Sequence, residues 1–419
     1  MSKSFLKTKV CVVGLGYIGL PTAALLAQNN YSVLGVDINE SIVQIINQGE
    51  IHIIESDLDK LVFDTVKSNF FRASVMPEFA DIFIIAVPTP FKDNHEADMS
   101  FVQDAALSIA TVLKKGNLVI LESTSPVGTT EKFAGWLSSA RKDLNFFGTN
   151  ADVHLAYCPE RVLPGKIISE LVENDRVIGG FTPDGAKKAS TFYQTFVRGN
   201  CVITDARTAE MTKLTENAFR DVNIGFANEL SLICDNLDIN VWELIKLANL
   251  HPRVNILNPG PGVGGHCIAV DPWFIVNSSP SQAKIIRTAR EVNDDKPNWV
   301  ISKIISAISR PHFKKDFKLS CLGLSFKADI DDLRESPALE IVSRLANLNI
   351  SREIMVVEPN IKELPIELSK FSNIKFIHLN DAIESSDILV LLVDHKEFKT
   401  INRKLLIDKI IIDTRGIWS

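Results

Sequence analysis

Short runs that are apolar at nearly every position alternate with helix-length amphipathic stretches in the first half of the chain. Four such runs are VCVVGL from Val10, YSVLGVD from Tyr31, DIFIIAVP from Asp81 and NLVILES from Asn117. Strands without polar alternation are typical of a parallel sheet that is covered on both faces. The segment Pro21–Asn29 has the length of a covering helix. We therefore expect an α/β fold that begins with a doubly wound domain over residues 1–204.

A helical pattern replaces the strands from Thr204 onward. Thr204 belongs to a residue type that caps helices. Downstream of it, one predicted helix face carries Met211, Leu214 and Ala218. Further helical stretches cover 241–250 and 283–292, with a break rich in proline and glycine between them. The pattern predicts a central helical domain over 205–310 that serves as a spine and a dimer surface.

Buried-strand runs return in the last hundred residues. They follow a polar, basic stretch, HFKKDFK, that is typical of a linker. The runs are KLSCLGLSF, EIMVVEP, DILVLLVDH and KIIIDTRG. Segments of helical length separate them, so the pattern predicts a second, smaller Rossmann-like domain over 316–419.

Size and charge narrow the function classes. The chain has 419 residues, of which 46% are hydrophobic, enough for two or three domains with full cores. The net charge is −6 and the sequence pI is 5.8, with lysine and arginine scattered along the chain. These values argue against nucleic acid or an anionic membrane as a partner, and favour an enzyme that binds anions locally.

The cysteines and the N-terminus bear on location. Six cysteines lie far apart with no CxxC spacing, which argues against zinc and against a disulfide framework. The first apolar segment is cut by Gly14, Gly16 and Gly19, unlike a signal peptide. No run approaches the roughly 18 apolar residues that cross a bilayer. We expect a soluble protein of the cytoplasm with reduced thiols.

A dinucleotide fingerprint follows the first predicted strand. Gly14, Gly16 and Gly19 form GxGxxG before a helix, and Asp37 ends the next strand. The glycines allow a tight turn and close approach of a pyrophosphate, while the acid accepts bonds from ribose hydroxyls. A carboxylate there repels a 2′-phosphate, so the pattern predicts NAD rather than NADP. The alternative is a glycine turn in an unrelated α/β protein.

Two further loops leave the carboxyl ends of predicted strands. AVPTP carries Thr89 and ESTSPVGTT carries Thr124. Ligands of such sheets bind beyond the strand ends, so these hydroxyls are candidates for cofactor or substrate contact. Turn-forming threonine and proline without function would give the same pattern.

Three polar residues share one face of the predicted central helix. Lys213, Asn217 and Arg220 are spaced i, i+4 and i+7. An ammonium beside an amide is suited to hold an alkoxide or a tetrahedral oxyanion. A solvated polar stripe is the alternative.

Cys267 stands at the end of a run rich in proline and glycine, HPRVNILNPGPGVGGHCIAVD. The glycines predict open backbone space beside the thiol, and a thiol in a chain that binds nicotinamide suggests oxidation through a covalent intermediate. Asp271 follows four residues later and is a candidate to activate water. An inert core cysteine is the alternative. His266 is either a ligand or simply exposed.

These segments together resemble the UDP-glucose/GDP-mannose dehydrogenase family over essentially the whole chain. The matching motifs are GLGYIGLPTAA, GEIHIIESDL, AVPTPF, ESTSPVGTTEK, YCPERVLPGK, KLTENAFRDVN, HPRVN, PGPGVGGHCIAVDPWFIV, AREVND and SFKADIDDLRESPA. The resemblance implies oxidation of C6 of a UDP-N-acetylhexosamine from alcohol to acid, with two NAD consumed and a thioester on Cys267. It also implies a homodimer or a higher homo-oligomer, and a role in bacterial surface polysaccharide synthesis. The C-terminal domain would bind UDP.

The resemblance assigns roles residue by residue. The catalytic set it implies is Cys267, Lys213, Asn217, Asp271 and Glu160. The cofactor set is Gly14, Gly16, Tyr17, Ile18, Gly19, Asp37, Thr89, Thr124 and Arg334. The substrate set is Arg161, Val162, Lys213, Asn217, Arg220, His251, Arg253, Gly264 and Lys327, with Arg253 reaching across a subunit boundary.

One position departs from the family pattern. UDP-glucose dehydrogenases carry a second glutamate four residues after the position of Glu160, and Pro164 stands there in this chain. The base that hydrolyses the thioester is therefore open. For the substrate, the N-terminal motifs favour UDP-N-acetylmannosamine, with UDP-N-acetylglucosamine as the alternative. Other readings are a single-step hydroxyacid dehydrogenase and a nucleotide-sugar sensor without catalysis.

Overall fold

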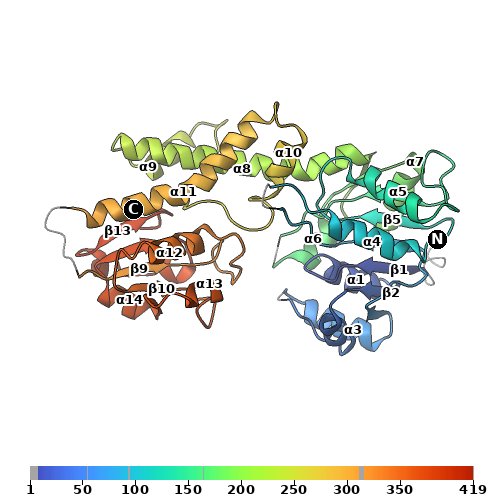
Figure 1. The fold of residues 1–419 in the computed structure, drawn as a ribbon, viewed down its shortest axis with the longest axis horizontal. Coiled ribbons are helices and arrows are strands. Elements are labelled where there is room, and N and C mark those ends of the chain that lie inside the picture. Colours follow the sequence, from blue (N-terminus) through green and yellow to red (C-terminus); the bar gives the residue numbers. More distant parts are fainter. Residues whose placement is uncertain (1–7, 54, 93–94, 164, 311–315, 419) are drawn as a thin grey trace. The chain divides into compact units, whose positions relative to one another are not determined.

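The computed structural model describes residues 8–53, 55–92, 95–163, 165–310 and 316–418. The chain forms two compact units, Met1–Glu216 and Asn217–Ser419. Their boundary falls inside the long helix α8, Ala206–Asn236 (Figure 1). Pro164 and residues 312–315 of the expected linker lie outside the described residues. Within those ranges, no helix is both long and apolar enough to span a bilayer.

The first unit contains an eight-stranded sheet in the order β3-β2-β1-β4-β5-β6-β7-β8. The strands are β1 Lys9–Val13, β2 Ser32–Val36, β3 Phe71–Ser74, β4 Ile82–Ile85, β5 Leu118–Leu121, β6 His154–Tyr157, β7 Arg176–Gly180 and β8 Cys201–Asp205. Neighbouring strands are parallel except for the antiparallel pair β6 and β7. The predicted parallel α/β fold is confirmed, and it continues to the edge strand β8.

Helices cover both faces of this sheet. They are α1 Gly19–Gln28, α2 Glu40–Asn47, α3 Leu58–Lys67, α4 Ser100–Ala110, α5 Thr129–Ala140, α6 Ile167–Glu173 and α7 Pro183–Tyr193. Alternate residues of β1 enter different cores: Val10 and Val12 face α1, α6 and α7, whereas Cys11 and Val13 face α4 and α5. This double burial explains why the strand sequence lacks polar positions.

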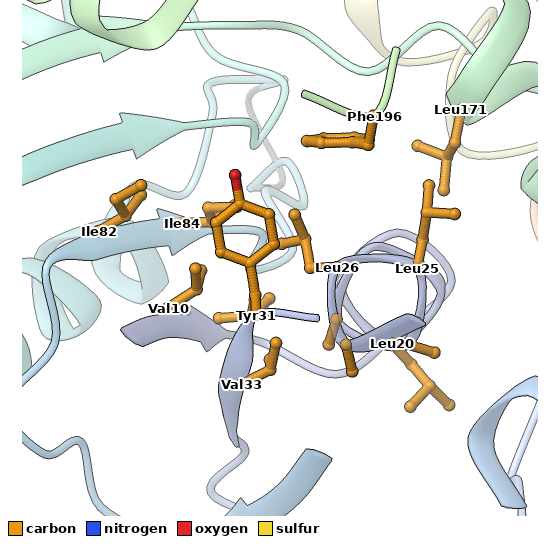
Figure 2. Close-up of a cluster of buried hydrophobic side chains, with 14 of the residues drawn as sticks. Val10, Leu20, Leu25, Leu26, Tyr31, Val33, Ile82, Ile84, Leu171 and Phe196 are labelled. Atoms are coloured by element: carbon orange, nitrogen blue, oxygen red, sulfur yellow. The ribbon is translucent and has the colours of Figure 1, made fainter. Parts of the chain in front are cut away.

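The core on the α1 face is drawn in Figure 2. Strand residues Val10 and Val33 lie beside Tyr31, whose hydroxyl lies 2.8 Å from that of Thr195. Leu25 of α1 lies next to Leu171 of α6 in the same cluster. Helix α6 is therefore packed directly against the helix that follows the glycine fingerprint.

The second unit joins a helical part to a five-stranded parallel sheet in the order β11-β10-β9-β12-β13. Its helices are the second part of α8, α9 Val241–Ala248, α10 Asp271–Ser278, α11 Lys284–Ile308, α12 Pro337–Asn347, α13 Ile366–Ser369, α14 Leu379–Ser385, α15 Lys396–Lys399 and the 3-10 helix Arg403–Leu406. Its strands are β9 Leu319–Leu322, β10 Ile354–Val357, β11 Ile374–Phe376, β12 Ile388–Leu391 and β13 Ile410–Asp413. The expected Rossmann-like C-terminal sheet is confirmed.

Two helix predictions need correction. Thr204 does not cap α8, because the helix begins at Ala206 and Asp205 directly precedes it; the side chain of Asp205 accepts the amide of Thr208 at 2.9 Å. Met211, expected on an apolar face with Leu214, is 38% exposed, whereas Leu214 is fully buried. Helix α10 was not predicted, because its apolar residues follow an Asp-Pro start in a region of many helix breakers.

The two sheets repeat one local arrangement. Gly14 donates its amide to Val36 at 2.8 Å, and Gly323 donates to Val357 at the same distance. In the second unit an acid, Glu358, accepts the amide of Leu324 at 2.7 Å and also lies 3.0 Å from Nε2 of the fully buried His395. In the second sheet, the carboxylate of Glu358 is therefore bonded to groups of the protein itself.

Candidate functional site

The glycine fingerprint forms the turn between β1 and α1. Gly14 has φ +92°, and a Cβ on it would lie 2.6 Å from the carbonyl oxygen of Ala86. A Cβ on Gly19 would collide with the carbonyl oxygen of Gly14. A Cβ on Gly16 would meet no atom within 4 Å. Two of the glycines thus close the turn, and the third leaves open space of the kind a pyrophosphate fills.

Asp37 is tied to this turn from the end of β2. Its Oδ2 accepts the amide of Leu15 at 3.0 Å, and its Oδ1 accepts the amide of Asn39 at 2.9 Å. The side chain is half-buried. Exposed Tyr17 and half-buried Ile18 lie at the start of α1, in the same turn. The arrangement fits the adenosine half of a dinucleotide, with the acid available to ribose hydroxyls.

The threonine loops follow β4, which pairs with β1, and β5, which pairs with β4 on its other side. Thr89 and Thr124 are both half-buried. Ser123 donates its hydroxyl to the carbonyl of Val87 at 2.7 Å, so one loop holds the other. Both hydroxyls therefore leave the same sheet edge as the fingerprint, as the sequence predicted.

Glu160 follows β6 and is buried in an ion pair. Its Oε2 accepts from Nη1 of Arg176 at 2.6 Å, and its Oε1 accepts the amide of Arg161 at 2.7 Å. The neighbouring Glu122 accepts from the hydroxyl of Tyr193 at 2.6 Å, and burial together with the charge of Glu160 raises the pKa of Glu122 to about 7. Both oxygens of Glu160 are engaged, which suits a residue that fixes a loop.

Arg161 and Val162 begin the loop after Glu160. The guanidinium of Arg161 pairs with Glu216 at 2.7 Å and also donates to the carbonyl of Asp175. Val162 is half-buried and packs on the α1 face of the core. These two residues, both expected to contact substrate, are thus anchored within the first unit.

Helix α8 carries Lys213, Asn217 and Arg220 at the predicted spacing. Lys213 is half-buried, Asn217 is buried and Arg220 is exposed. The start of the helix is held by Glu210, which accepts the amides of Gly128 at 2.6 Å and of Thr130 at 2.7 Å. Burial raises the pKa of Glu210, although the hydrogen bonds from Thr130 and Gly128 act to lower it.

The glycines before Cys267 do not open space beside the thiol, which corrects that expectation. A Cβ on Gly264 would lie 2.4 Å from the carbonyl oxygen of Glu335, and one on Gly265 would lie 2.9 Å from the ring of Phe326. The amide of Gly265 donates to the carbonyl of Arg334 at 3.1 Å. The glycine run therefore brings the SFKADIDDLRESPA loop against the cysteine loop, and Cys267 itself is half-buried.

Asp271 begins α10 one turn after Cys267. Its amide donates to the carbonyl of Cys267 at 2.8 Å. Its Oδ2 accepts from Nδ2 of Asn217 at 2.6 Å, and the carboxyl is buried, with 2% of the residue exposed. The second unit therefore joins a thiol loop, a carboxyl and an amide in one arrangement, which is suited to hold water near a reacting carbonyl.

A buried network behind this arrangement was not predicted. Arg290 of α11 donates to Asp221 of α8 at 2.5 Å and to the carbonyl of Ile268 at 3.3 Å. Asn293 adds a bond to Asp221 at 2.8 Å. The motifs KLTENAFRDVN and AREVND contain these residues, yet helical spacing alone could not show that they meet. Arg290 holds the backbone next to Cys267.

The remaining expected substrate and cofactor residues lie on loops of the second unit. His251 and Arg253 are exposed, as is Lys327, while Gly264 is half-buried. Arg334 pairs with Asp332 at 2.6 Å and keeps 49% of its side chain exposed. Lys327 and Arg415 border a shallow pocket beside Gly262.

Comparison with protein families gives three matches that together span most of the chain. The UDP-glucose/GDP-mannose dehydrogenase NAD binding domain matches residues 8–197, the central domain matches 207–295 and the UDP binding domain matches 320–419. The chain belongs to the UDP-glucose/GDP-mannose dehydrogenase family. It is an NAD-dependent nucleotide-sugar dehydrogenase, which confirms the predicted enzyme class and cofactor.

Individual relatives cover nearly the whole length. The UDP-N-acetyl-D-mannosamine dehydrogenase of Campylobacter jejuni is 62% identical over 93% of this chain and 96% of its own. The NDP-N-acetyl-D-galactosaminuronic acid dehydrogenase of Ralstonia nicotianae is 57% identical over 98% of this chain and 96% of its own. The solved UDP-D-ManNAc dehydrogenase of Pyrococcus horikoshii has a TM-score of 0.87 and 37% identity, covering 98% and 96% of the two chains.

The roles of the individual site residues stay predictions. The three family matches begin and end near the predicted domain limits. The boundary between the two compact units of the structure instead lies within α8. The three-domain division accordingly stays a prediction as well. Residue patterns predicted the glycine turn, Cys267 and Asp271, the family resemblance added residues such as Glu160 and Arg253, and the structure adds how these segments are held.

Proposed function

We propose that this member of the family oxidises C6 of UDP-N-acetyl-D-mannosamine to the carboxylic acid in two steps, for bacterial surface polysaccharide synthesis. The observation that carries the proposal is the arrangement of Cys267, Asp271 and Asn217, in a chain 62% identical to a dehydrogenase named for that sugar. A cytoplasmic location, where NAD and nucleotide sugars are made, fits this reaction.

The chemistry divides among the residues as follows. Bound NAD would accept a hydride in each oxidation, and the glycine turn and Asp37 would hold it. Lys213 takes the alcohol proton or holds the oxyanion in the first oxidation. The Cys267 thiolate then adds to the aldehyde carbon, and loss of the second hydride leaves a thioester. Water cleaves the C–S bond, giving the acid and restoring the thiol.

Asp271 is our choice for the residue that handles the hydrolytic water. Its Oδ2 accepts from Asn217, and its backbone amide donates to the carbonyl of Cys267, so the carboxyl stands one helical turn from the residue that carries the thiol. Glu160, the other candidate, has both oxygens engaged by Arg176 and by the amide of Arg161. Its geometry favours a loop-fixing role.

Lys327 and Arg415 support a nucleotide-binding role for the second unit. Both line the pocket beside Gly262, where Arg415 also pairs with Asp394 at 2.8 Å, so the positive charge that suits a diphosphate comes chiefly from Lys327. This placement agrees with the UDP binding domain that matches residues 320–419.

We also propose that the enzyme works as a homodimer, through an apolar stripe on α8. Phe219, Phe226 and Ile233 recur at intervals of seven residues and are 68%, 52% and 47% exposed. Nearby Leu250 is 77% exposed. Large exposed apolar side chains at helical spacing are typical of a helix–helix interface.

A second candidate substrate is UDP-N-acetylgalactosamine, because one relative at 57% identity is named for the galactosaminuronic acid product. The test supplies purified enzyme and NAD with the manno, gluco and galacto forms of the UDP-N-acetylhexosamine separately. We expect kcat/KM for the manno form to exceed the others by at least about tenfold, a difference of roughly 1.4 kcal/mol in transition-state binding. Preference for another epimer would overturn the substrate assignment, and no NADH from any of them would overturn the function.

A further inference from the structure

The loop that carries Arg161 and Val162 is held by carboxylates along its backbone. Every second amide from Arg161 to Ile167 donates to a glutamate side chain. The pairs are Arg161 to Glu160 at 2.7 Å, Leu163 to Glu170 at 2.8 Å, Gly165 to Glu55 at 2.8 Å and Ile167 to Glu55 at 2.8 Å. Charge-assisted bonds of this kind are stronger and more directional than neutral ones.

Glu55 is the member of this set that comes from far away in the sequence. It lies 110 positions before Gly165 and is 7% exposed. Its Oε2 accepts the amide of Gly165 and its Oε1 accepts the amide of Ile167. One carboxylate therefore bridges two amides at the end of the loop. A buried carboxylate loses its hydration and depends on such donors. Glu55 therefore joins the GEIHIIESDL segment rigidly to the substrate loop.

The two ends of the loop are fixed differently. At its start, the buried pair of Glu160 and Arg176 holds the residue before Arg161. At its end, Ile167 begins α6, whose Leu171 lies against Leu25 of α1 (Figure 2). Glu55 holds the segment between these anchors, where Gly165 has φ +86°. Without Glu55, the amides of Gly165 and Ile167 would lose their shared acceptor.

We propose that Glu55 is a positioning residue for the nucleotide sugar. By holding the loop end through two amides, it keeps Arg161 and Val162 in the conformation that receives the substrate. It acts through the loop and does not touch the reacting atoms. This inference rests on the proposed function, in which these two residues contact the sugar nucleotide.

The test compares Glu55→Gln with Glu50→Gln, a matched control at an exposed glutamate of the same segment. A glutamine presents an N–H group to one of the two amides and loses the negative charge. We expect KM for the UDP-N-acetylhexosamine to rise roughly tenfold or more, because displaced contact residues bind poorly. KM for NAD should change less than about twofold, and the control should match wild type.

A second variant and a second readout keep the test decisive. Glu170→Gln frees only the Leu163 amide and should shift the sugar KM in the same direction by less. Hydrogen exchange without any ligand should show faster exchange at Gly165 and Ile167 in Glu55→Gln, and this readout needs no activity.

Each outcome decides something. If wild type is active and Glu55→Gln leaves KM for the sugar nucleotide unchanged, the proposal is wrong. It is also wrong if the substitution changes KM for the sugar nucleotide and KM for NAD equally. Unchanged exchange at the two amides would overturn it as well. If wild type oxidises none of the three sugars while the exchange result holds, the proposed function fails and the anchoring role of Glu55 stands.

Discussion

Replacing Cys267 by alanine is expected to lower production of the sugar acid by at least about 1000-fold, because removing a covalent nucleophile leaves only the residual contribution of binding. Water adds poorly to a bound aldehyde, and without the thiol no thioester forms. Binding of NAD should persist, since the glycine turn and Asp37 belong to the first unit. Acid production is measured by product chromatography, and NAD binding by calorimetry.

Cys201 provides the control for that substitution. It is also half-buried, lies on the edge strand β8 and has no place in the proposed chemistry. Cys201→Ala should keep turnover near the wild-type value. If Cys267→Ala made acid at an undiminished rate, Cys267 would be structural and the thioester scheme would be wrong.

Replacing Arg290 by leucine is expected to cost about 3–5 kcal/mol of unfolding free energy, because it leaves a buried carboxylate without its charged partner. Arg290 and Asp221 are both fully buried and lie 2.5 Å apart. Burial already raises the pKa of Asp221 to about 6, against the opposing effect of Arg290. Urea unfolding followed by the fluorescence of the second unit's tryptophans measures the loss.

A surface pair in the same unit is the matched control for Arg290. Arg344 pairs with Glu340 at 3.0 Å, with side chains 40% and 51% exposed. Arg344→Leu should cost no more than about 1 kcal/mol, as exposed ion pairs do. Adding Asp221→Leu to Arg290→Leu should recover part of the loss, since the unpaired charge is then gone. Equal small costs for both arginines would contradict the assigned role of the buried pair.

The sequence predicted the sheets well because burial on both faces leaves a direct mark on composition. Val10 to Val13 contribute to two cores at once, so none of them is polar. Helix ends were harder to predict. Thr204 and Asp205 are both capping types, and the start of α8 at Ala206 decides that Asp205 holds the helix.

The candidate site was predicted as a list of residues rather than as an arrangement. Local patterns pointed to Cys267, Asn217 and Asp271, but the bond between Asn217 and Asp271 joins positions 54 apart. The glycine run predicts open space beside the thiol. In the structure, Glu335 and Phe326 take up the space where side chains on Gly264 and Gly265 would lie. Such contacts depend on which loops pack together, and the local spacing of residues does not predict this packing.

Buried polar partners were missed for the same reason. Glu55 and Arg290 are charged residues of a kind that local sequence fits equally well to solvated loops and helix surfaces. Their burial, at 7% and 0% exposed, comes from segments more than 60 positions away. These two residues hold the backbone on which the predicted contact residues stand.

The most direct test of the thioester scheme is the number of NADH molecules formed for each sugar nucleotide consumed. Purified enzyme with limiting UDP-N-acetyl-D-mannosamine and excess NAD is followed by absorbance until the sugar is exhausted. The account predicts about two NADH and one carboxylic acid per sugar, because two hydrides leave the same carbon before hydrolysis. One NADH per sugar, with an aldehyde or ketone as product, would contradict it.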